Sequence, residues 1–211
     1  MERSEFCKLY WNYYMGLEAD FVNTERFVSF DLGTNNLYGQ NEDEVEKGNS
    51  MTYSIEYVRQ IQAICSEIDV LLKEICKTIN EDERAENMKE YSSMVLSDIF
   101  WRKITCQKID FRRTELQPFK NWKSGEDYQA PEWWLGYNAV KHNRIENYKR
   151  ANLKNVVNAL AGLFILENYF VKKITEGTEE NDVPDDMSQI FKMKDWETKR
   201  VVIGKDFYAE V

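Results

Sequence analysis

The only histidine of the chain, His142, lies in a short stretch of side chains that could do chemistry. On a helix, Asn138 and His142 would share a face, with Lys141 at its edge. Imidazole can act as a general acid or base near neutral pH, and lysine or arginine can hold a phosphate. Asn138, Lys141, His142 and Arg144 are therefore predicted to form a catalytic set. It would assist attack by a ribose 2′-OH on the adjacent phosphodiester without a metal ion.

Four more residues of this region are predicted to contact such a substrate: Trp134, Tyr137, Lys149 and Arg150. Residues 131–154 carry five cations and two anions, whereas the whole chain has a net charge of −9. Local positive charge in an acidic protein indicates a surface for an anionic ligand or a partner protein. The overall charge excludes a protein that binds nucleic acid over its whole surface.

The same residues allow a structural interpretation. An Asn138–His142 pair beneath Trp133 and Trp134 could be a polar network that ties helices together inside the core, with Glu67 as a further partner. The two tryptophans are predicted chiefly as core anchors, although an indole can also stack on a base. Both interpretations stay open at the level of sequence.

Most other chemistries lack their motifs. The chain lacks the phosphate-binding motif G-x-x-x-x-G-K-[ST] and the dinucleotide-binding motif G-x-G-x-x-G. It also lacks the zinc-binding motif H-E-x-x-H and the hydrolase nucleophile motif G-x-S-x-G. Its four cysteines form no C-x-x-C pair and are expected to be reduced thiols. We therefore predict no metal site and no cofactor.

Four helices are expected to position these residues, at 54–80, 83–100, 131–148 and 152–170. The first has apolar residues at helical spacing, and the last is apolar on most sides, so it should be the central helix. Pro131 and Asn152 are typical of helix starts. The sequence predicts an all-α fold, a four-helix bundle with small extended or β additions between the second and third helices and at the termini.

The sequence predicts that the chain has three parts. Residues 1–52 would form an N-terminal arm, with a short strand near Arg26–Asp31. Residues 53–175 would form the helical domain. Residues 176–211 would be an acidic linker and tail, with a strand near Val201–Ile203.

At its third helix the chain resembles the HEPN superfamily of helical, RNA-cleaving domains from prokaryotic toxin and defence systems. The motif of that family is an arginine, usually followed by a polar residue, with a histidine four to six residues beyond. His142 matches the histidine and Asn138 the polar residue, whereas Tyr137 stands at the arginine position. Lys141 or Arg144 would have to supply the missing cation.

The resemblance implies a metal-independent ribonuclease or RNA-binding component that forms a homodimer. It equally implies a non-catalytic partner, because many members of the family lack the complete motif. The sequence has no run of apolar residues long enough to span a membrane and no secretory signal. A cytoplasmic protein with RNA or another protein as its partner is therefore expected.

Overall fold

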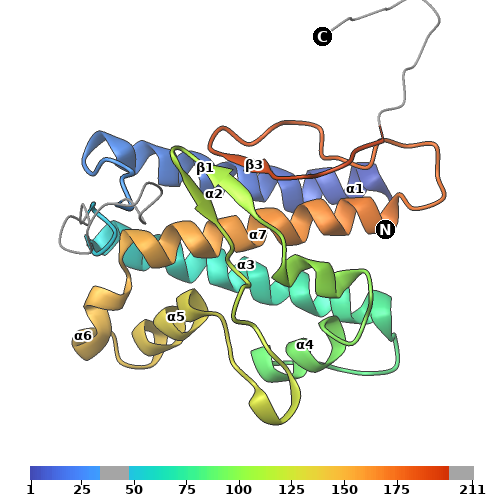
Figure 1. Cartoon of the computed structure of the whole chain (residues 1–211), viewed down its shortest axis with the longest axis horizontal. Coiled ribbons are helices and arrows are strands. Elements are labelled where there is room, and N and C mark those ends of the chain that lie inside the picture. Colours follow the sequence, from blue (N-terminus) through green and yellow to red (C-terminus); the bar gives the residue numbers. More distant parts are fainter. Residues whose placement is uncertain (34–47, 200–211) are drawn as a thin grey trace, which may run out of the picture.

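A computed structural model describes residues 1–33 and 48–199 of the chain. The fold is mostly helical, with one small three-stranded antiparallel sheet (Figure 1). The larger helices are α2 (Asn12–Asn23), α3 (Ile55–Ile79), α4 (Met88–Val95), α5 (Glu132–His142) and α7 (Leu153–Ile174), and the strands are β1 (Ile109–Phe111), β2 (Thr114–Leu116) and β3 (Phe191–Met193).

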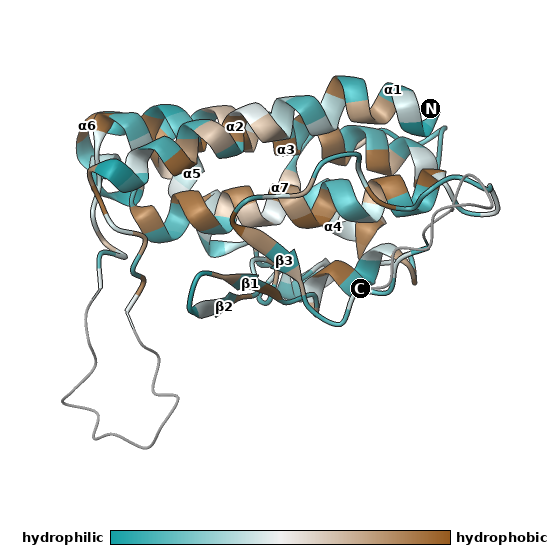
Figure 2. Ribbon diagram, turned by 90° about the horizontal axis from the view of Figure 1, so that it is seen from above, coloured by the Kyte–Doolittle hydropathy of each residue, from teal (hydrophilic) through white to brown (hydrophobic). Residues whose placement is uncertain are grey.

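Helix α7 occupies the centre of the molecule, as predicted. It begins where the side chain of Asn152 accepts a hydrogen bond from the backbone N–H of Asn155, at 3.0 Å. Nearly every residue from Leu153 to Val171 is buried, because neighbouring elements cover the helix on all sides. Figure 2 shows its apolar ribbon between the N-terminal helices and the sheet.

Helix α3 confirms the predicted apolar stripe. Ser54 caps its start by accepting from the backbone N–H of Tyr57, and the stripe from Val58 to Ile75 is buried against α7. The two long helices lie side by side over much of their length (Figure 1).

Residues 3–26 are helical and pack on this core. Helix α1 (Arg3–Phe6) continues through a π-helical turn at Cys7–Trp11 into α2. Phe6, Trp11 and Tyr14 are fully buried, and Phe6 packs against Phe170 of α7. The π turn holds more residues than an α turn, which shifts the apolar positions and explains the lack of a clean period in the sequence.

Two local predictions in this part of the chain were wrong. Residues 27–33 contain no strand, because the chain leaves a 3-10 turn at Thr24–Arg26 as irregular backbone. The second helix is shorter than residues 83–100. Asn87 starts α4 by accepting from the N–H groups of Lys89 and Glu90. Asp98 accepts from the N–H groups of Phe100 and Trp101 just before a separate 3-10 helix at Trp101–Thr105.

The sheet partly matches the expectation. A β1–β2 hairpin lies between α4 and α5, as predicted, with Ile109 opposite Leu116. Strand β3 pairs with the other edge of β1, where Ile109 lies opposite Met193. The strand predicted at 201–203 lies outside the described residues.

The segment after α7 is exposed at residues 176–180, as expected for a solvated linker, but not in the residues that follow. Asp182 and Pro184 are buried, and Arg3 donates to the carbonyl of Val183 at 2.6 Å and pairs with Asp185 at 2.7 Å. Residues 182–185 therefore contact the N-terminal helix. The acidic composition gave a misleading signal, because some of these acids have fixed partners.

One buried acid has no such partner. Glu167 of α7 is fully buried, and neither carboxylate oxygen has a hydrogen-bond partner within residues 1–33 and 48–199. Burial raises the pKa of Glu167 well above its usual value, and the nearby carboxylate of Glu67 on α3 raises it further. Burial also raises the pKa of Glu67. The fold therefore favours the protonated form of Glu167 over its carboxylate.

This buried acid makes stability depend on pH. The unfolded chain ionises Glu167 above about pH 4.5, so the free energy of unfolding should fall as the pH rises from there toward the raised pKa of the folded state. In that pH range the free energy of unfolding should fall by about 1.4 kcal/mol for each pH unit. Glu167→Gln should remove this slope in urea unfolding measured between pH 5 and pH 7. The exposed control Glu126→Gln should keep it, and an unchanged slope in Glu167→Gln would contradict the assignment.

Candidate functional site

Helix α5 carries most of the residues that were predicted as a site, but it ends earlier than expected. The prediction extended it to Tyr148, whereas the backbone leaves the helix at Asn143, with φ −144° and ψ 80°. Asn143 then caps the short helix α6 (Arg144–Asn147) by accepting from the N–H of Glu146. An asparagine that can bond to nearby backbone favours such a break. Arg144, which was predicted to lie on the same helix as Lys141 and His142, therefore lies beyond the end of α5.

The inner face of α5 is anchored in the core, as the two tryptophans predicted. Trp133 is buried and its indole N–H donates to the carbonyl of Pro118 at 2.9 Å. Trp134 and Tyr137 are also buried, with ring centroids 5.0 Å apart. These contacts fix the rotation of the helix, and hence the side on which Asn138 and His142 emerge.

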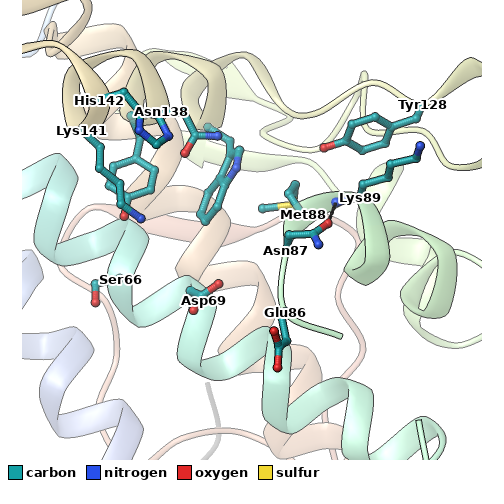
Figure 3. Close-up of a pocket in the computed structure, with 12 residues that line it drawn as sticks. Ser66, Asp69, Glu86, Asn87, Met88, Lys89, Tyr128, Asn138, Lys141 and His142 are labelled. Carbon is teal, nitrogen blue, oxygen red and sulfur yellow. Dashed lines mark hydrogen bonds between the residues drawn. The ribbon is translucent and has the colours of Figure 1, made fainter. Parts of the chain in front are cut away.

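A groove of about 450 Å³ lies beside that side of α5. Trp134, Tyr137, Asn138, Lys141 and His142 line one wall (Figure 3). The opposite walls come from α3, from the start of α4 and from the loop before α5: Ser66, Asp69, Glu86, Asn87, Met88, Lys89 and Tyr128. Five of the eight predicted site residues are thus brought together.

His142 is exposed at this groove. Its ring forms no hydrogen bond with any described residue, Glu67 included. The ring lies outside the core, so a base or acid there would be accessible to a ligand in the groove. Glu67 is close enough to the buried Glu167 for its charge to raise the pKa of that residue.

The groove itself is balanced in charge. Lys89 and Lys141 line it together with Asp69 and Glu86. Asp69 already accepts from the phenol of Tyr91 at 2.8 Å and pairs with Lys73 at 2.6 Å. An anion in this groove would therefore depend on Lys89, on Lys141 and on cations from its border.

Those border cations lie beyond the break at Asn143. Arg144, Lys149 and Arg150 are exposed on α6 and the following turn and do not line the groove. We call these three residues and Lys141 the basic edge. None of the four forms an ion pair with the described part of the chain. Two of them lie over aromatic rings, Lys141 at 5.5 Å from the ring centroid of Tyr137 and Lys149 at 5.9 Å from that of Tyr53.

The sequence did not predict that α3 and α4 form walls of the groove. Asp69 and Ser66 lie on a helix that was interpreted only through its apolar stripe. One local signal was available, since Asn87 followed by Glu90 has the spacing of a capping box and marks the true start of α4. The proximity of α4 to α5 depends on tertiary packing and has no local signal.

Comparison of the chain with models of protein families, with curated proteins and with solved structures found no significant match in any of the three. No helix within the described ranges has the length and apolar character needed to cross a membrane.

The position of α5 depends on Gly136, where the helix lies very close to Asn155 and to the carbonyl of Arg150. A Cβ there would lie 2.6 Å from the side-chain nitrogen of Asn155 and 3.4 Å from the carbonyl of Arg150. Asn155 is itself held, because that nitrogen donates to the same carbonyl at 2.8 Å. The glycine thus lets α5 contact the start of α7 and the turn that carries the basic edge.

Gly136→Ala should therefore lower the free energy of unfolding by about 1–3 kcal/mol, measured by urea denaturation. Gly16→Ala is the matched control, because Gly16 lies in α2 with nothing within 4 Å of the added Cβ. That control should raise stability by about 1 kcal/mol, since alanine is the better helix former. Equal effects in the two variants would show that the contact is unimportant.

Proposed function

We propose that this chain is a HEPN-like protein that binds single-stranded RNA at the basic edge and cleaves it with His142 as general acid or base. The observation that carries the proposal is an exposed imidazole bordered by cations that have no ion pair among the described residues. Unpaired cations next to the exposed ring of Tyr53 suit a flexible polyanion with stackable bases. In this proposal α3, α4, α5 and α7 are the four principal helices of a HEPN-like bundle.

The cleavage would need no metal ion. His142 takes the proton of a ribose 2′-OH, the 2′-oxygen attacks the adjacent phosphorus, and the 5′-oxygen leaves with a proton from an acid. Lys141 is suited to stabilise the phosphate, because it lies over the ring of Tyr137, which occupies the arginine position of the resembled motif. Tyr137 itself is buried and is not available to a phosphate. A homodimer would bring a second His142 to serve as the acid.

The alternative is a non-catalytic interaction protein. Exposed apolar side chains lie on the segments next to the basic edge, at Met51, Tyr53, Ile55 and Ile145. Residues 52 and 53 pair with the backbone at residues 152 and 153, so these side chains belong to one end of the molecule. Such a patch favours a protein partner. In either case four free thiols suit a reducing cytoplasm.

The test is cleavage of a fluorescent single-stranded RNA in EDTA. The wild type should produce fragments that end in a cyclic phosphate, and His142→Ala should slow cleavage by about 10²–10⁴-fold with little effect on binding. The combined change Arg144→Ala, Lys149→Ala, Arg150→Ala should weaken RNA binding. The slope of the logarithm of the binding constant against the logarithm of the salt concentration should also become shallower. The change should be about one unit for each phosphate that the variant no longer neutralises.

Lys103→Ala is the control, because Lys103 is an exposed cation on a different element, and it should leave both properties unchanged. Binding without cleavage would remove the catalytic part of the proposal. Absence of both binding and cleavage in the wild type would favour the interaction protein.

A further inference from the structure

The groove beside His142 has two sides of different chemistry (Figure 3). Asn138, Lys141 and His142 line it from α5, where the proposed cleavage requires a phosphate. Asp69 of α3 and Glu86, which lies just before α4, line the opposite side. Because carboxylates repel a phosphate, the two acids indicate that a different part of the ligand lies beside them.

Both carboxylates are able to accept hydrogen bonds from a ligand. The side chain of Glu86 is exposed and forms no hydrogen bond or ion pair with residues 1–33 or 48–199. Asp69 is held in place, since it accepts from the phenol of Tyr91 at 2.8 Å and pairs with Lys73 at 2.6 Å. An ionised carboxylate has about four acceptor positions, so Asp69 keeps capacity for a further donor.

The rest of the lining suits a polar, planar group. The hydroxyl of Ser66, the phenol of Tyr128 and the amide of Asn138 line the groove without a side-chain hydrogen bond to any residue in the described ranges. The volume of about 450 Å³ lies within the range of about 300–1,000 Å³ that is usual for small-molecule sites. The groove is therefore large enough for one nucleoside of an RNA strand.

The bases of RNA differ in how they would meet a carboxylate. Cytosine carries an amino group at its C4 position and can donate to Asp or Glu. Uracil has the same shape but carries a carbonyl oxygen at C4, and an oxygen acceptor facing a carboxylate gains no hydrogen bond. A groove side that carries Asp69 and Glu86 therefore favours cytosine over uracil.

We propose that this groove holds the base next to the scissile phosphate and selects cytosine over uracil through the carboxylates of Asp69 and Glu86. The inference rests on the proposed function, because it needs an RNA strand at Lys141 and His142. It adds a preference that the basic edge does not provide, since contacts to phosphates carry no information about the base.

The test compares oligo(C) and oligo(U) of equal length with 2′-fluoro sugars, which lack the hydroxyl needed for cleavage. Fluorescence anisotropy at neutral pH should show that the wild type binds oligo(C) about tenfold more tightly than oligo(U). Equal binding of the two oligomers would overturn this inference and leave RNA binding intact. Failure to bind either oligomer would overturn both the inference and the proposed function.

Glu86→Gln should remove most of the preference, because an amide can donate to the carbonyl of uracil as well as accept from cytosine. Asp69→Asn should have the same direction of effect. Glu81→Gln is the matched control, since Glu81 is exposed in the same connector and does not line this groove, and it should keep the preference. An unchanged preference in both Glu86→Gln and Asp69→Asn would contradict the role of the two acids.

The combined change Arg144→Ala, Lys149→Ala, Arg150→Ala separates the two kinds of contact. It should weaken oligo(C) and oligo(U) by the same factor, because these cations lie outside the groove and phosphates are identical in the two oligomers. A loss confined to oligo(C) would place the selection at the basic edge and overturn the inference.

Discussion

The fold depends on covering a helix that is apolar on nearly every side. Helix α7 leaves almost no surface for solvent, so α3, α5, the N-terminal helix and the sheet must each bury one part of it. Burial of this kind is the main favourable contribution to folding, and it is close to proportional to the apolar area removed from water. The same requirement explains why Gly162 of α7 lies so close to the rings of Trp133 and Phe119. A Cβ at Gly162 would be 3.2 Å and 3.3 Å from those rings.

Elements with a strong local signal could be predicted from the sequence. The apolar stripe of α3, the cap at Asn152 and the burial of α7 depend on spacing and on single side chains, and all three are confirmed. The N-terminal and C-terminal segments were misjudged because their order comes from distant partners. Arg3 bonds to Val183 and Asp185 across most of the chain, and β3 pairs with β1, which precedes both α5 and α7 in the sequence.

The candidate site was predictable in part for the same reason. Residues on one helix face, Asn138, Lys141 and His142, do line a common groove. Arg144 was wrongly predicted to lie on the same helix, because the break at Asn143 needs only one side chain that competes with the helix backbone. The groove walls at Asp69 and Tyr128 come from other elements, and no spacing rule within one segment could have joined them to His142.

The contact between Arg3 and Val183 joins residues that are 180 positions apart in the chain. Glu18 likewise bonds to Ser188, 170 positions later. Contacts of such long sequence separation form slowly, because the entropy of closing the loop must be overcome before the contact stabilises anything. During synthesis the N-terminal helix therefore leaves the ribosome with aromatic side chains, Phe6 and Trp11 among them, that pack against α7 much later in the chain. Until then the nascent chain exposes a surface that a chaperone would recognise.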